Sequence, residues 1–371
     1  MLVIQPWVQQ HQNRHLADTR PSRNAGRKLA KAGYYVMQPK TVIFIHIALL
    51  PVYLTVAVYL NLIPPTVVSN LSSLLRLAKT NLLKQRLAAS LSSALHSSEP
   101  SSQAENMSTL QFSLRPSQER GKADHGWLKT FHTFSFAMYQ DHKHELWGPL
   151  RVINEDRVLP GTGFGTHSHR EFEIFSYVVS GELEHKDSMG NVEVLKRGDI
   201  QLTSAGTGIS HSEKTYGSRP VHFLQIWSLP HTSRLTPKYY TRTFFDAEKT
   251  NKWVRVVAPA GSEGVSDDRE APGPAPVRSA LTLYATLAEK GQKVEQPLKG
   301  KKGYVHVVQT SGYNPGKATG AAVRIGATGS PAELELEEGD GAYIAMGNGG
   351  STFVLENIGD KTAEVLLFDL E

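Results

Sequence analysis

The stretch GTGFGTHSHREFEIFSYVVSG, residues 161–181, decides the fold. Its second half, residues 173–179, is rich in β-branched and aromatic side chains, and glycines stand at both ends of the stretch. This pattern is typical of a β-strand bounded by turns. His167 and His169 are one residue apart, and because side chains alternate between the two faces of a strand, both imidazoles should point the same way. The stretch therefore predicts one half of a metal site.

The other half is expected in GDIQLTSAGTGISHSE, residues 198–213, where His211 and Glu213 are again one residue apart. Two antiparallel strands that face each other across a small barrel would bring the two pairs together. Three imidazole nitrogens and one carboxylate oxygen suit Fe, Mn, Ni, Cu or Zn. The chain has no cysteine, so any metal must be held by His, Asp or Glu.

Glu173 is a rival for the fourth ligand, because it shares the face of His167 and His169 if the strand stays regular. It would then be a ligand, a group that orients an imidazole or a base. A partly buried glutamate paired with Arg170 is the simpler interpretation. On the same reasoning Phe175 is a candidate for an aromatic pocket over the metal, although core packing also explains it.

The rest of the region after residue 107 is dense in β-prone runs punctuated by Gly, Asn and Asp, which predicts sandwiches or barrels. The Pro- and Gly-rich segment PAGSEGVSDDREAPGPAP, residues 259–276, cannot form an interior strand. β-prone runs resume after it, so we expect two tandem barrels, the second a diverged copy of the first. The predicted boundaries are a metal-binding domain at 107–258, a linker at 259–277 and a second domain at 278–371. The first domain is expected to begin with β-prone runs at 131–139 and 151–154.

Residues 1–106 differ in kind and are expected to be an N-terminal extension unrelated to the barrels. Residues 1–100 hold eleven Lys or Arg and two acids, so the remaining 271 residues carry −4 of the total charge of +5. Residues 41–63 lack any formal charge and are long enough to span a bilayer, which makes a membrane anchor one interpretation. A transit-peptide-like leader is a second. A chain that starts at Met107 is the third, and it implies a cytoplasmic or nuclear protein.

Several long segments carry a resemblance to a known family. They are ADHGWLKTFHTFSF at 123–136, GPLRVINEDRV at 148–158, THSHREFEIFSYVVSGELEH at 166–185, DSMGN at 187–191, RGDIQLTSAGTGISHSE at 197–213 and VHFLQIW at 221–227. With them the chain from about residue 115 onward resembles the pirin-like bicupin proteins, in a pattern of the fungal type. The resemblance implies an all-β fold of tandem cupins, which are jelly-roll-type β-barrels.

The resemblance also implies a ligand set. The family binds its metal through three histidines and a glutamate from the second motif, and these fall on His167, His169, His211 and Glu213. Cupins in general take the carboxylate from the first motif, G-x5-H-x-H-x3-E, which this chain also satisfies from residue 161 to Glu173. The pirin-like pattern favours Glu213 as the fourth ligand. The expected cofactor is one divalent transition metal, iron first, with Mn, Ni, Cu and Zn as alternatives.

The second repeat departs from this metal-site pattern. It offers Glu295 and His306 but no His-x-His, and His306 lies in an apolar alternating run that indicates simple packing. We expect a degenerate, metal-free second cupin that supports the first. The histidines at positions 142, 144, 185, 222 and 231 lack partners at ligand spacing.

The resemblance implies a flavonol 2,3-dioxygenase of the quercetinase type, in which dioxygen opens the heterocycle of the substrate with loss of carbon monoxide. Glu213, or Glu173 beside it, would accept the proton of the substrate hydroxyl. The alternative is an iron-dependent transcriptional co-regulator that binds other proteins without turnover. A small aromatic substrate, a monomeric state and no direct contact with nucleic acid are expected, the last because the barrel region is mildly acidic.

Overall fold

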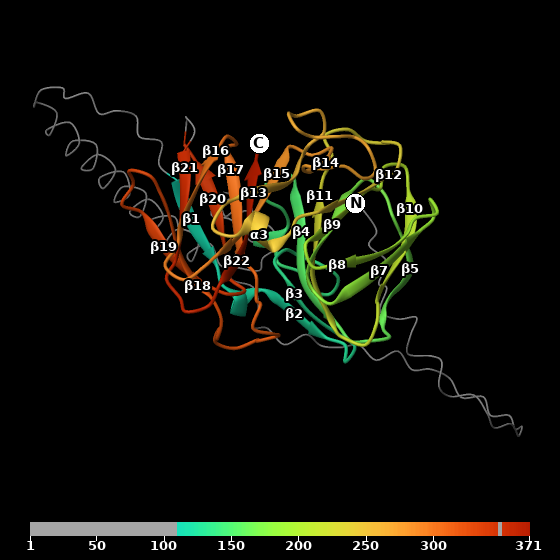
Figure 1. Cartoon of the computed structure of the whole chain (residues 1–371), viewed down its shortest axis with the longest axis horizontal. Helices are drawn as coiled ribbons and strands as arrows, with labels where there is room; N and C mark the ends of the chain where they lie inside the picture. The colour runs from blue at the N-terminus through green and yellow to red at the C-terminus, as the bar shows by residue number, and fades with distance from the viewer. Residues whose placement is uncertain (1–109, 348–350) are drawn as a thin grey trace, which may run out of the picture. The chain divides into compact units, whose positions relative to one another are not determined.

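The computed structural model describes residues 110–347 and 351–371. The extension at 1–106, the membrane-anchor interpretation of 41–63 and the start at Met107 lie outside these residues. Within them the helices are short: η2 (Ser117–Glu119), η3 (His142–His144) and α3 (Asp246–Lys249). No helix in this part of the chain is long and apolar enough to cross a membrane. All other regular structure here is β-strand (Figure 1).

The first barrel consists of a seven-stranded and a four-stranded sheet. The larger sheet has the order β12 (Lys238–Thr243), β9 (Asp199–Ser204), β6 (Glu173–Ser180), β11 (Val221–Ser228), β4 (Leu150–Val158), β3 (Leu128–His132) and β2 (Gly121–Asp124). The smaller sheet has the order β5 (Gly163–His169), β10 (Ile209–Thr215), β7 (Glu182–Asp187) and β8 (Val192–Lys196). A small apolar cluster that includes Val178 of β6 and Leu183 of β7 joins the two sheets.

The second barrel repeats this arrangement. Its larger sheet has the order β1 (Leu110–Arg115), β20 (Gly341–Met346), β17 (Lys302–Val307), β22 (Ala363–Leu370), β15 (Leu281–Ala288), β13 (Val254–Pro259) and β14 (Ala275–Val277). Its smaller sheet has the order β16 (Lys293–Leu298), β21 (Ser351–Asn357), β18 (Ala322–Ala327) and β19 (Glu333–Glu337). Most of these strands are drawn in orange to red in Figure 1.

The largest apolar core lies between the two larger sheets. It contains Phe175, Tyr177 and Ile226 from the first barrel and Leu283 and Phe368 from the second, all at most 1% exposed. Strand β6 is buried along almost its whole length because one face lines its own barrel and the other meets this core. Full burial of one such side chain stabilises the fold by about 1.5–3 kcal/mol, so the two barrels stabilise each other.

Strand pairing crosses the domain boundaries drawn from the sequence. β1 precedes the first barrel in the chain but pairs with β20 of the second. β13, placed in the first domain by the boundary at residue 258, pairs with β15. The segment predicted as a linker contributes β14, which takes the end of the sheet. An edge position suits the prolines of this segment, since an edge strand can leave N–H positions unpaired.

One predicted strand, residues 131–139, is wrong beyond its first residues. β3 ends at His132, and residues 133–139 form turns with a single bridge between Phe136 and Tyr139. Ala137 has a left-handed φ of 49°, which a continuous strand does not allow.

The interiors of the two barrels differ in chemistry. The interior of the second is apolar, with Val305, Val323 and Phe353 fully buried. The first contains a row of buried polar side chains that lie side by side across five strands. In register from β3 to β9, these are His132, Asn154, Gln225, Ser176 and Gln201. Polar groups inside a barrel cost free energy unless they are paired, so this row indicates that the first barrel carries the site.

Candidate metal centre

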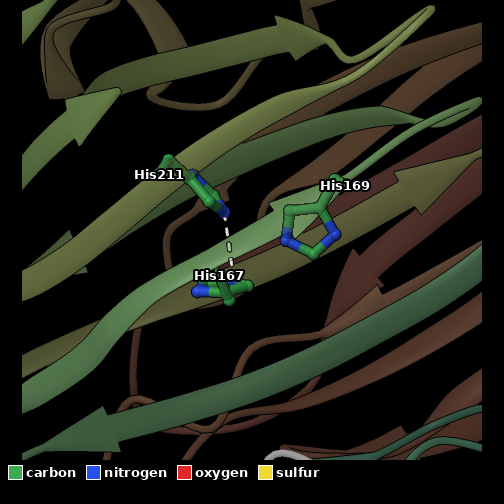
Figure 2. Close-up of side chains that lie close together, drawn as sticks. All are labelled: His167, His169 and His211. Carbon is green, nitrogen blue, oxygen red and sulfur yellow. Dashed lines mark hydrogen bonds between the residues drawn. The ribbon is translucent and has the colours of Figure 1, made fainter. Parts of the chain in front are cut away.

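Three histidines meet between β5 and β10. His167 and His169 alternate on β5, so both point to the same face. His211 on β10 is the residue directly opposite His167 in the antiparallel ladder. The ring centroids are 4.7 Å apart for His167 and His169, 4.6 Å for His167 and His211, and 4.9 Å for His169 and His211. One ring nitrogen from each lies within 4.8 Å of the others, and Figure 2 shows the rings converging.

Glu213 follows His211 after an irregularity in the ladder between the two residues. It is 1% exposed and points into the barrel, where Ser176 Oγ donates to Oε1 at 3.2 Å and Gln225 Nε2 donates to Oε2 at 3.0 Å. One carboxylate oxygen of Glu213 and one ring nitrogen each of His211 and His185 lie within 4.8 Å of one another, close enough to bind a single metal ion. The polar row of the larger sheet therefore holds the carboxylate inside the barrel, beside His211.

Glu173 lies in a different environment. Ser204 Oγ donates to its Oε1 at 2.5 Å and the Arg278 backbone N–H donates to its Oε2 at 3.0 Å. Burial raises the pKa of Glu173, and the residue belongs to neither of the ligand-sized groups found among the described residues. These contacts do not support Glu173 as a ligand or as a base at the three histidines.

The reason is a break in the strand between His169 and Glu173. Glu171 has a left-handed φ of 61°, so β5 ends at His169 and β6 starts in the opposite sheet. The alternation assumed from His167 onward stops there. Phe175, expected over the metal on the same assumption, instead lies in the core between the barrels.

Two imidazoles of the cluster, those of His169 and His211, are held in their neutral form. Burial and the neighbouring imidazoles lower the pKa of His169 to about 3 and that of His211 to about 2. His167 Nδ1 donates to the Gly165 carbonyl at 2.8 Å, which leaves its Nε2 facing His211 Nε2 at 3.2 Å. His169 Nε2 and His211 Nδ1 are buried without a hydrogen-bond partner among the described residues. Neutral, unpaired imidazole nitrogens beside a carboxylate fit a divalent transition metal.

An aromatic wall borders the cluster. The Trp227 ring lies 4.8 Å from the His169 ring at an interplanar angle of 78°. Phe172 and Phe136 pack on Trp227, with centroids at 5.2 and 5.5 Å. Trp227 Nε1 is buried and has no hydrogen-bond partner within the described part of the chain. The wall is an apolar border to the cluster and contains one buried, unpaired N–H donor.

His185 was not expected at the site, and the sequence assignment of this residue as lacking a partner is wrong. It lies on β7, directly opposite Glu213 in the ladder, and is fully buried. The signal was present in the alternation of GELEHKD, where Leu183 and His185 share a face. We predicted no strand there, so the pairing of β7 with β10 was missed.

Comparison with known proteins agrees with this geometry. Residues 113–228 match the pirin family. A quercetin 2,3-dioxygenase of Escherichia coli K12 is 42% identical over 197 residues, which are 53% of this chain and 80% of that protein. A pirin-like protein of Caulobacter vibrioides is 34% identical over 215 residues, 57% of this chain and 89% of that protein.

Solved structures place the fold in the same group. The crystal structure of the bacterial pirin YhhW of E. coli in complex with nickel(II) is 33% identical, with a TM-score of 0.57. The match covers 70% of this chain and 99% of that one. The two barrels described above are accordingly tandem cupins, and the chain belongs to the pirin family.

Proposed function

We propose that the chain binds one divalent transition metal through His167, His169, His211 and Glu213. The convergence of three imidazoles in a polar barrel interior supports this set, and burial keeps two of them, His169 and His211, neutral. The nickel(II) in the related pirin also supports a divalent ion. Iron, expected from the resemblance, and nickel are both compatible with nitrogen and carboxylate ligands.

We further propose that the protein is a flavonol 2,3-dioxygenase. The observation that carries this proposal is the aromatic wall of Trp227, Phe172 and Phe136 beside the histidines. A flat aromatic substrate can pack against this wall. Relatives named quercetin 2,3-dioxygenase support the same substrate class.

The residues divide the work as follows. A bound metal ion supplies Lewis acidity, which lowers the pKa of a substrate hydroxyl. Glu213 is placed to accept the released proton, because Ser176 and Gln225 hold its carboxylate inside the barrel. The wall around Trp227 excludes water from one side of the substrate. The apolar interior of the second barrel offers no comparable set of groups among the described residues.

Oxygen uptake by the full-length protein in the presence of quercetin tests the proposal. The apo protein is loaded separately with Fe²⁺, Mn²⁺, Ni²⁺, Cu²⁺ and Zn²⁺, and oxygen and carbon monoxide are followed. At least one metal should support turnover, and the apo protein should not. Substituting His169 by Ala should abolish it, whereas the exposed His231→Ala should have no effect. If the metal binds and no metal gives turnover, the co-regulator interpretation replaces the enzyme.

A further inference from the structure

His185 is a fully buried polar side chain at the site that the proposed ligand set does not use. Its side chain has no exposed surface, and neither ring nitrogen has a hydrogen-bond partner among the described residues. The nearest acceptor is Asp187 Oδ2, at 3.6 Å from His185 Nε2, which is too long for a hydrogen bond. A buried imidazole with two unpaired nitrogens lowers the stability of the fold. A ligand bound to one of these nitrogens would compensate for that cost.

The surroundings of His185 provide the rest of a ligand set. Its ring centroid lies 5.1 Å from that of His211, at 61°, and the ladder places it directly opposite Glu213. One donor atom from each of His185, His211 and Glu213 lies within 4.8 Å of the others, and all three residues are buried. His167 and His169 are only half-buried. The group of His185, His211 and Glu213 thus lies deeper in the barrel than His167 and His169, which we call the outer pair.

Asp187 and Tyr239 flank His185 on two sides. Asp187 is tied down because its Oδ1 accepts from the backbone N–H groups of Met189 and Asn191 and its Oδ2 from Asn191 Nδ2. On the other side of His185, the Tyr239 ring lies at 5.1 Å and 36°. A carboxylate behind a histidine is the usual support for a metal-binding imidazole.

We propose that the barrel contains a second, deeper metal position formed by His185, His211 and Glu213, which takes a borderline divalent ion such as Zn²⁺. This inference rests on the proposed metal centre, with which it shares His211 and Glu213. Because two ligands are common to both positions, one chain holds one ion at a time. Two imidazoles and a carboxylate are a sufficient protein ligand set for zinc.

Zinc binding by full-length variants tests the proposal. The outer pair is removed in a His167→Ala, His169→Ala double variant, and zinc per chain is measured after equilibrium dialysis. The double variant should still bind one ion, more weakly than the wild type. Adding His185→Phe should remove that ion, whereas adding His231→Phe, an exposed histidine outside the cluster, should not.

Two further measurements separate a lost ligand from a lost fold. The zinc-induced rise in Tm is read for each variant against its own apo form, and His185→Gln serves where His185→Phe unfolds. Asp187→Asn should weaken zinc binding about 10- to 100-fold in the double variant. A double variant that folds and binds no zinc overturns the deeper position alone. A wild type that binds no metal overturns the proposed function as well.

Discussion

At the residue scale, Glu173 and Glu213 illustrate how one backbone angle decides a side chain's role. Both are buried carboxylates near a histidine pair in the sequence. The left-handed φ of Glu171 sends Glu173 to the other sheet, whereas Glu213 stays beside His211. The spacing in the sequence left either glutamate possible as the fourth ligand. Side chains alternate between two faces only while the strand continues.

Glutamine substitutions distinguish the two carboxylates. Glu213→Gln removes the negative charge of the proposed ligand and should lower the metal content after dialysis. Glu173→Gln keeps an oxygen that accepts from the Arg278 backbone N–H, and its NH2 group can donate to Ser204 Oγ. The substitution should leave the metal content close to that of the wild type. Elemental analysis of both variants at the same free metal concentration measures the difference. Equal loss, or greater loss at Glu173, would contradict the assignment of Glu213.

His132 should make the folded state sensitive to acid. Burial lowers its pKa to about 4, although the hydrogen bond to Asn154 acts in the opposite direction. The unfolded chain, with a pKa of 6.5, binds more protons at this residue between these two values. His132 therefore contributes stability that is present above pH 6.5 and is lost as pH falls towards 4.

The size of this effect is about 3 kcal/mol, from 1.36 kcal/mol per pKa unit. Urea unfolding of the wild type and of His132→Gln from about pH 7 to about pH 4 measures it. The stability advantage of the wild type should shrink by that amount across the range. If the free energy of unfolding depends on pH in the same way in both proteins, His132 is not the source of the acid sensitivity.

At the element scale, glycine decides how closely β5 and β10 approach. A Cβ at Gly163 would lie 2.3 Å from the Glu213 carbonyl oxygen and 2.5 Å from Lys214 Cα. Gly163 therefore allows β5 to pack directly on the part of β10 that carries Glu213. The sequence showed this glycine, but the close approach follows only from the register of the two strands.

Gly163→Ala should push the two strands apart and weaken metal binding without changing any ligand. A backbone atom is the nearest contact, so the strand itself must shift. Metal titration followed by calorimetry should show a raised Kd, and the apo protein should unfold at a lower temperature. Gly316→Ala is the control, because the nearest atom to its added Cβ is 3.5 Å away. An unchanged Kd in Gly163→Ala would mean that the approach of the strands does not position the site.

Strand patterns were predictable where apolar and β-branched residues dominate, as in β6, β11 and β22. β7 and β19 were missed because charged residues alternate with the buried ones on these strands, as in ELELE of β19. Such strands have one face in water, and composition alone resembles a loop. The missed β7 is also why His185 was not placed at the site.

At the scale of the whole described region, a buried ion network connects the two barrels. Glu155 on β4 accepts from Arg120 Nη1 at 3.2 Å and from His222 Nε2 at 3.0 Å within the first barrel region. It also accepts from His306 Nε2 at 3.1 Å and the Gln309 backbone N–H at 2.8 Å in the second. The sequence analysis interpreted His306 as a packed histidine. Its partner Glu155 is 151 residues away, and no local pattern in the sequence indicates such a pair.

Replacing Glu155 by Gln should strongly destabilise the protein. Burial alone would raise the pKa of Glu155, but hydrogen bonds from His222 and His306 hold it well below its usual range. The substitution leaves the Arg120 guanidinium buried without its carboxylate, which costs about 3–5 kcal/mol. Denaturant unfolding measures the loss. Asp360→Asn, which breaks the exposed pair with Lys290, should produce no measurable change.

The first barrel should not form without the second, although the composition of residues 259–277 predicted separate domains. A chain ending at residue 258 loses β20, the partner of β1, and exposes the core face that includes Phe175 and Ile226. Glu155 would also lose two of its hydrogen-bond donors. An exposed apolar face of this kind favours aggregation over a unique fold. We expect the truncated chain to lack a cooperative thermal transition by circular dichroism and to lose the metal affinity of the full chain. Cooperative unfolding with undiminished affinity would show instead that the second cupin is dispensable to the site.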